Sequence, residues 1–289
     1  MSVQIVQEKL SAYNCQSTQE EMFALREITQ ELVLTALSRS DFFKVAAFQG
    51  GTCLRILHSL DRFSEDLDFV LKETNNRFDL VNFLKNIEIE LNAYGYEPTF
   101  KDRSTIDASV KKGFIKDTSI GKLLELHYVQ TNSRPKAIRI KIEVDTNPPA
   151  GSHYETRRLD WPLAFAVTLQ DLPSLFAGKC HALLCREYVK GRDWYDLLWY
   201  VARKVPINAL LLKNALVQQG PWKDKKLTLN DRWLQDAFQN KIQSVDWKEA
   251  KQDIQRFLKP NQLQQLDQWN EKFFLETVSK INQQNKPTN

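Results

Sequence analysis

The sequence predicts an α/β protein in which a mixed sheet with flanking helices is followed by a purely helical C-terminal part. Three observations lead to this class. Up to about residue 170, amphipathic helical patterns alternate with short apolar runs of strand length. Residues 138–145 alternate between Ile or Val and charged residues, which is typical of a half-buried strand. From Pro206 onward only helical patterns remain, and prolines separate several of them.

The N-terminal part begins with a clear amphipathic helix over residues 18–38. Thr18 can cap this helix, and Leu25, Ile28 and Leu32 lie on one apolar stripe. The other expected helices cover residues 52–60 and 78–94. Apolar or alternating runs predict a sheet only a few strands wide, with strands over 42–48, 63–71, 119–130 and 134–144 and short edge strands over 156–160 and 165–169.

The C-terminal half of the chain is expected to be helical. The patterns predict helices over 172–188, 193–202, 208–219, 229–240, 246–258 and 262–281. Four tryptophans at helical positions are expected to fill a core, namely Trp222, Trp233, Trp247 and Trp269. We therefore predict two domains, an α/β domain over residues 1–204 and a helical domain over 205–289.

Composition excludes several classes of protein. The chain has 289 residues, of which 42% are hydrophobic, enough for a substantial core. No apolar run approaches the roughly 20 residues that a membrane-spanning helix needs, and the first residues lack the pattern of a signal peptide. Four cysteines are scattered without metal-type spacing. These features predict a reduced, cytoplasmic protein without a membrane partner.

Positive charge is concentrated in the last third of the chain. The whole chain carries a formal net charge of +4, whereas residues 201–289 contain 15 Lys and Arg against 9 Asp and Glu. A basic surface can follow a phosphate backbone. An ordinary solvated helical surface explains the same excess equally well.

The stretch with the most chemical information combines a Gly50-Gly51-Thr52 turn with an Asp66-x-Asp68 pair. The glycines allow the backbone to approach a bulky anion closely, and the helix expected after them would offer free N–H groups. The two aspartates flank the start of an apolar strand, where residues two apart point to the same side. Because two close carboxylates repel each other, a divalent cation would stabilise them, and oxygen ligands suit Mg²⁺.

This pairing predicts phosphoryl or nucleotidyl transfer, with a triphosphate on the glycine turn and a metal on the aspartates. The alternative is that Asp66 and Asp68 are exposed residues of a surface hairpin, since Asp-x-Asp alone is a common pattern. The turn at a suitable distance upstream favours the functional interpretation.

A third carboxylate is expected on the alternating strand. Glu143 is the first choice, because it could join a metal site or accept a proton from an attacking hydroxyl. Asp145 points the same way and competes for the role. Alternatively, Glu143 pairs with nearby Lys141 or Arg139.

Two further candidates lie downstream. Lys179, among apolar residues of a helix, could bind a triphosphate as a point charge, although for this residue alone a lysine extending to the surface is the simpler explanation. Asp193 could cap the next helix, or it could form an ion pair with Arg192 that orients Lys179.

Together these motifs resemble a known family. The segment from Gly50 to Asp68 is similar to the nucleotidyltransferase fold of the polymerase-beta-like superfamily. The segment from Lys179 to Asp196, with Lys190-Gly-Arg-Asp193-Trp-Tyr-Asp196, resembles the AbiEii/AbiGii toxin family, and residues 246–258 resemble its C-terminal helix.

The resemblance implies a toxin of a type IV toxin–antitoxin or abortive-infection system that transfers a nucleotide from a nucleoside triphosphate with Mg²⁺ or Mn²⁺. Related toxins of the MenT group modify the tRNA 3′ end, and other members are described as GTP-binding. The family's partner is an antitoxin with a winged-helix DNA-binding part that usually does not bind the toxin tightly. By position, the residues implied to bind or react are Gly50, Gly51, Thr52, Ser64, Asp66, Asp68, Lys179 and Asp193.

Two alternatives to a tRNA-modifying enzyme stay open. The chain could be an NTP-binding regulatory protein without turnover, or a nucleotidyltransferase that modifies a protein or a small molecule. The sequence does not distinguish between these functions.

Overall fold

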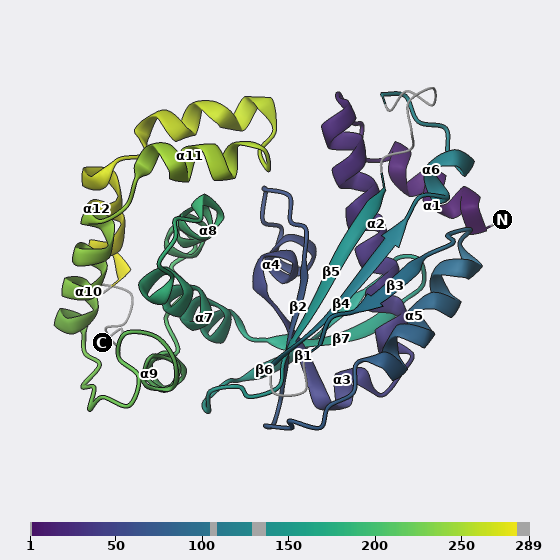
Figure 1. The fold of residues 1–289 in the computed structure, drawn as a ribbon. Helices are drawn as coiled ribbons and strands as arrows, with labels where there is room; N and C mark the ends of the chain where they lie inside the picture. Colours follow the sequence, from purple (N-terminus) through teal and green to yellow (C-terminus); the bar gives the residue numbers. More distant parts are fainter. Residues whose placement is uncertain (1, 105–108, 129–136, 282–289) are drawn as a thin grey trace. The chain divides into compact units, whose positions relative to one another are not determined.

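The computed structural model describes residues 2–104, 109–128 and 137–281, and it confirms the predicted α/β class (Figure 1). The chain forms two compact units. The first consists of Met1–Ser59, Phe63–Pro148 and Glu155–Leu169, and the second of Leu60–Arg62, Pro149–Tyr154 and Gln170–Asn289. The domain boundary predicted after residue 204 stays a prediction.

The first unit is built on a seven-stranded mixed sheet with the order β3-β4-β5-β2-β1-β7-β6. Strand β2 pairs in parallel with β5 and antiparallel with β1, so β2 and β5 are central neighbours. The strands cover Ala46–Gln49 (β1), Leu67–Leu71 (β2), Thr99–Asp102 (β3), Val110–Asp117 (β4), Ile138–Asp145 (β5), Tyr154–Leu159 (β6) and Phe165–Gln170 (β7). The sheet is therefore wider than expected, and β7 is an inner strand rather than an edge strand.

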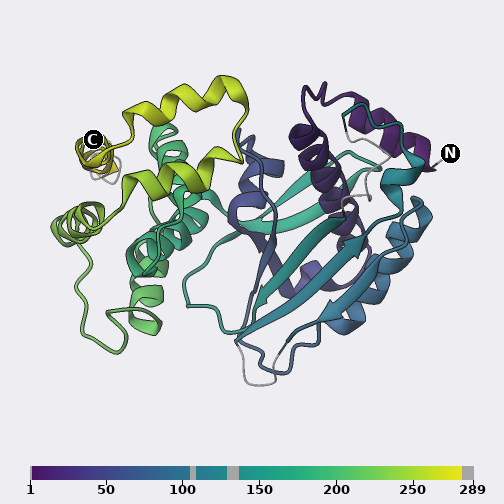
Figure 2. The same ribbon diagram turned by 45° about the horizontal axis from the view of Figure 1, so that its top comes forward.

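Helices cover one face of this sheet. The long helix α2 (Thr18–Ser38) packs against α5 (Val81–Ala93) and against β5, whose Ile and Val side chains are buried, and Leu84 of α5 lies against Gly113 of β4 (Figure 1 and Figure 2). The remaining helices of this unit are α1 (Ser2–Ser11), α3 (Phe42–Val45), α4 (Gly50–His58) and α6 (Ile120–Leu123). Because β5 buries one face, its charged residues all lie on the opposite face.

Two strand predictions were wrong. The expected strand 42–48 begins as the short helix α3, and only its end pairs in the sheet. The expected strand 119–130 is instead the helix α6 followed by a loop as far as residue 128, and the strand precedes it as β4. The residues that β4 buries are Lys111, Gly113, Ile115 and Asp117, so no apolar alternation marks it. Residues 129–136, which include parts of two expected strands, lie outside the described residues.

The second unit is helical, as predicted. Its helices are α7 (Leu172–Cys185), α8 (Gly191–Ala202), α9 (Ala209–Gln218), α10 (Asp231–Gln243), α11 (Trp247–Gln255) and α12 (Glu271–Ser279), with a 3₁₀ segment η1 over Pro260–Gln268. The expected single helix 262–281 is interrupted because Asn270 caps α12 by accepting a hydrogen bond from Phe273. Of the four tryptophans expected in a core, Trp269 is buried, and the half-buried Trp247 stacks on the buried Phe274 at 4.4 Å. Trp222 and Trp233 are half-buried and pack edge to face on each other, so the prediction is confirmed only in part. Among the described residues, no helix is both long and apolar enough to cross a bilayer.

Candidate active site

The glycine turn joins β1 to α4 and lies directly against an aspartate of the next strand. Gly50 has φ +80°, which side chains rarely adopt, and a Cβ added to it would lie 2.5 Å from Oδ2 of Asp68. Gly51 follows in the first turn of α4, whose first N–H groups have no partner within the helix. A glycine is thus required where the turn, the helix start and the Asp68 carboxylate meet.

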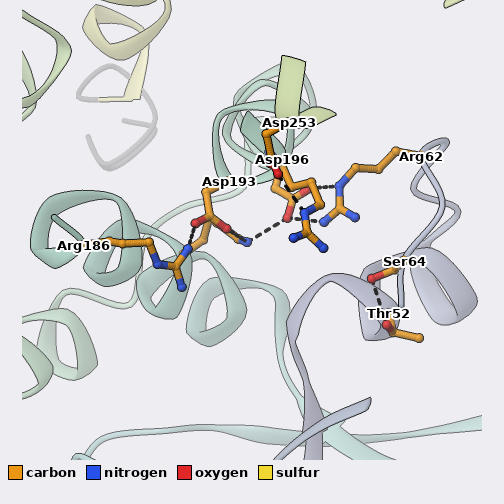
Figure 3. Close-up of polar contacts among 9 residues, drawn as sticks. Thr52, Arg62, Ser64, Arg186, Asp193, Asp196 and Asp253 are labelled. Carbon is orange, nitrogen blue, oxygen red and sulfur yellow. Dashed lines mark hydrogen bonds and ion pairs between the residues drawn. The ribbon is translucent and has the colours of Figure 1, made fainter. Parts of the chain in front are cut away.

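The segment before β2 is held from two sides. The Thr52 hydroxyl on α4 contacts the carbonyl oxygen of Asp66 and lies 2.9 Å from Ser64 Oγ (Figure 3). From α2, the Gln30 side chain donates to the carbonyl oxygen of Glu65 at 2.9 Å. These bonds fix the backbone that presents Asp66 and Ser64, so the predicted residues Thr52 and Ser64 belong to one local structure.

Three carboxylates gather on the open face of the sheet. Asp68 on β2 lies in register with Glu143 on β5, and both side chains are half-buried. Asp66 precedes β2 by one residue and is also half-buried. Asp145 lies further along β5, opposite Val70 rather than an acid, and its carboxylate accepts a hydrogen bond from Asn147 N–H. The register therefore favours Glu143 as the third carboxylate. We call Asp66, Asp68 and Glu143 the acidic patch.

Two lysines neutralise part of the acidic patch. Lys141 Nζ lies 2.7 Å from one carboxylate oxygen of Glu143, and Lys112 Nζ lies 3.4 Å from the other. Burial lowers the pKa of Lys141, but the hydrogen bond and charge of Glu143 and the charges of Asp66 and Asp68 raise it above its usual value. The pairing of Glu143 with Lys141, an alternative from the sequence, is thus present.

The acidic patch offers carboxylate ligands to a cation. Within the described part of the chain, no three His, Cys, Asp or Glu side chains are arranged closely enough to hold an ion. Asp66 and Asp68 nevertheless offer hard oxygen ligands on one face, which suits Mg²⁺ or Mn²⁺. Glu143 could join them only after its lysine contacts loosen. The residues therefore fit a divalent cation as a pair, with Glu143 as an adjacent third carboxylate.

The second unit contains a buried ion cluster around Lys179. Its ammonium, on α7, lies 2.7 Å from Asp193 Oδ1 and 2.8 Å from Asp196 Oδ2, one turn apart on α8. The side chain of Lys179 is 12% exposed, which excludes the interpretation of a lysine extending to the surface. Asp193 does not cap α8, because its carboxylate binds Lys179 and Arg186. The structure thus brings together Lys179 and Asp193, two residues predicted from the sequence.

Sequence reasoning missed three members of this cluster. Arg62 forms two hydrogen bonds to Asp196, each 2.7 Å long, and Arg186 binds Asp193 (Figure 3). We call these five residues, Lys179, Asp193, Asp196, Arg62 and Arg186, the Lys179 cluster. The expected partner of Asp193, Arg192, instead lies 3.6 Å from Asp253 and over the ring of Phe257. The only local pattern that could have indicated the cluster is the three-residue spacing of Asp193 and Asp196, which places both on one face of a helix.

The Lys179 cluster predicts how stability depends on acid. Burial raises the pKa of Asp193, but Lys179, Arg186 and Lys190 lower it more, to about 2. Because the folded pKa is below the unfolded value of about 3.9, the ionised Asp193 stabilises the fold above that value. This contribution is lost as the pH falls from about 4 towards 2. In urea unfolding between pH 5 and pH 2.5, Asp193→Asn should lose less stability than the parent protein; an equal loss would contradict the prediction.

The glycine turn gives a second prediction. Gly50→Ala should lower nucleotide transfer at least about a hundredfold, because the new Cβ must displace the Asp68 carboxylate and small displacements in an active site have effects of this size. Gly178→Ala is the matched control, since a Cβ at Gly178 on α7 would meet nothing within 4 Å. Labelled nucleotide transfer measures both variants. Full activity of Gly50→Ala would show that the close approach has no role.

Comparison with known proteins identifies a family and a fold. A family model described as "Nucleotidyl transferase AbiEii toxin, Type IV TA system" matches residues 32–273. JHP933 from Helicobacter pylori is 15% identical with a TM-score of 0.52, and the match covers 89% of this chain and 90% of JHP933. An H. pylori structure described as a candidate nucleotidyltransferase is also 15% identical, with a TM-score of 0.49 and coverage of 90% and 91%. No curated protein matches the chain. The likeness to JHP933 supports the fold.

Proposed function

The chain belongs to the AbiEii family of nucleotidyltransferase toxins of type IV toxin–antitoxin systems, and from this premise we propose that it transfers a nucleoside monophosphate from an NTP to an acceptor hydroxyl. The observation that carries the proposal is the close approach of the Asp68 carboxylate to the Gly50 turn, which leaves no room for a Cβ at Gly50. It brings an anion-binding turn and a candidate metal ligand to the same point. A phosphate on the turn would therefore lie beside a cation on Asp68.

We assign the following roles to the acidic patch. Asp66 and Asp68 would hold Mg²⁺ or Mn²⁺, with Glu143 as the third carboxylate. The cation would neutralise charge that develops on the transferred phosphate and on the leaving pyrophosphate. Glu143 could alternatively accept the proton of the attacking hydroxyl, since a carboxylate must lie within hydrogen-bond reach of that proton to act as a base.

The remaining candidates would bind the triphosphate. Gly50 and Gly51 would offer backbone N–H groups, and the hydroxyls of Thr52 and Ser64 would support that turn. Lys179 belongs to the second unit, and we propose for it a contact of its own with a nucleotide phosphate. An ammonium has three N–H donors, and Asp193 and Asp196 account for two of them. In this proposal the third donor binds a phosphate oxygen.

The acceptor that we favour is the 3′ end of tRNA. The basic last third of the chain supports a nucleic-acid substrate, and the lysines and arginine at 223, 225, 226 and 232 are exposed. The family also implies an antitoxin partner, for which we propose a winged-helix protein. The alternatives are transfer to a protein or small molecule, and NTP binding without turnover.

One experiment separates these functions. The protein is incubated with total tRNA, a cell extract and each α-³²P-labelled NTP in turn, with Mg²⁺ or Mn²⁺. Label in tRNA that ribonuclease removes supports the favoured acceptor. Label in protein or small molecules identifies the second function, and nucleotide binding without transfer identifies the third. Equal transfer in the presence of a chelator would refute the role of the cation.

A further inference from the structure

A lysine ammonium lies against the acidic patch, and none of the roles proposed for the carboxylates uses it. Lys141 lies on the same strand and the same face as Glu143, two residues away, and its ammonium contacts the Glu143 carboxylate at 2.7 Å. Lys112 reaches the other carboxylate oxygen from β4, opposite Glu143 in register. Both oxygens of Glu143 therefore face a positive charge.

Lys141 has the stronger claim to a role in the patch. It is 30% exposed, against 43% for Lys112, and its contact with Glu143 is shorter by 0.7 Å. Asp68 lies opposite Glu143 in register on the neighbouring strand. The Lys141 ammonium thus occupies one of the three acids that we assign to a divalent cation, and it would repel a cation bound at that carboxylate.

We propose that Lys141 is a displaceable counter-ion of the acidic patch, which holds Glu143 when no divalent cation is bound and is released to bind a substrate phosphate when the cation and NTP bind together. The proposal rests on the proposed function. Lys141 keeps its proton throughout and only exchanges partners, from a carboxylate to a phosphate oxygen, as suits a flexible ammonium.

The consequence is a coupling between two ligands. A cation that binds alone must compete with Lys141 for Glu143, so its affinity is reduced. When NTP is present, the displaced ammonium gains a phosphate partner, so the same cation binds more tightly. By linkage, the cation must then tighten NTP binding by the same factor.

Binding of Mn²⁺ tests the proposal without reference to activity. Free Mn²⁺ is measured by electron paramagnetic resonance, with and without an α,β-methylene NTP that cannot be cleaved, using whichever of the four bases binds best. In the parent protein the nucleotide should tighten Mn²⁺ binding. Lys141→Met should bind Mn²⁺ alone about tenfold more tightly than the parent, and the nucleotide should tighten its Mn²⁺ binding by a smaller factor.

Three variants serve as controls. Lys141→Arg keeps the charge and should bind Mn²⁺ alone as weakly as the parent. Lys116→Met removes the same charge from the same strand as Lys112, but opposite Arg139 rather than Glu143, so it should leave Mn²⁺ affinity unchanged. Asp68→Asn should abolish Mn²⁺ binding. Circular dichroism shows whether each variant is folded.

The outcomes separate this inference from the proposed function. If Asp68→Asn abolishes Mn²⁺ binding but Lys141→Met binds Mn²⁺ no more tightly than the parent, the counter-ion role is wrong and the metal site stands. If the parent and Asp68→Asn bind Mn²⁺ equally, the metal site itself is wrong. Tighter Mn²⁺ binding by both Lys141→Met and Lys116→Met would show a general charge effect and would also refute the inference.

Discussion

Asp68→Asn should abolish nucleotide transfer, with a loss of at least about a thousandfold. A bound cation contributes several kcal/mol of charge stabilisation in the transition state, and each 1.4 kcal/mol corresponds to about a factor of ten in rate. Asp68 is the acid that both the glycine turn and Glu143 adjoin. Asn keeps its shape but removes the charge. Transfer of labelled nucleotide should fall by this factor, and cells that express the variant should no longer be inhibited in growth.

Asp145→Asn is the matched control for this prediction. Asp145 lies on the same face of the sheet as Glu143 but opposite Val70, and it accepts a hydrogen bond from its own turn. Its replacement should leave transfer within about threefold of the parent, since Asn keeps the size of this half-buried side chain and Asp145 lies opposite Val70 rather than an acid. A fully active and folded Asp68→Asn variant would refute the catalytic model, and an inactive Asp145→Asn variant would identify Asp145 as the third carboxylate.

The part of the site that the sequence predicted best is local along the chain. Gly50 and Asp68 are 18 residues apart, and a turn, a short helix and a strand connect them, so their spacing carried the information. The alternation of β5 is also a local pattern, and it predicted correctly that Glu143 lies on the face opposite the buried Ile and Val side chains. Period-two patterns fail where the buried side chains are polar, and β4, which buries Lys111 and Asp117, was therefore missed.

The Lys179 cluster shows what the sequence could not predict. Arg62 and Asp196 are 134 residues apart, and no local pattern marks their pairing. Arg192 directly precedes Asp193 and was the expected partner, yet adjacent residues of a helix point in different directions. Arg186 takes that place from the end of α7. Such pairings depend on how helices pack, which the spacing of residues does not specify.

Removal of the charge of Asp196 should strongly destabilise the second unit. Asp196 is fully buried, and Arg62 is 2% exposed. Asp196→Asn would remove the carboxylate that forms two hydrogen bonds with Arg62 and would leave Lys179 its contact with Asp193. Breaking a buried pair in this way costs about 3–5 kcal/mol. Urea unfolding followed by tryptophan fluorescence is a suitable measurement, because six of the seven tryptophans lie in residues 170–289.

Two further variants test whether the stability lost in Asp196→Asn comes from the missing carboxylate charge or from a general loss of packing. Glu276→Ala removes the exposed partner of Lys280 on α12 and should change stability by less than about 1 kcal/mol. The double variant Arg62→Met, Asp196→Leu leaves no charge of that pair buried, so it should recover part of the stability that Asp196→Asn loses. If the double variant is less stable than Asp196→Asn, the ion pair is needed for specific packing rather than for charge balance. If Asp196→Asn is as stable as Glu276→Ala, the buried pair makes no net contribution to the fold.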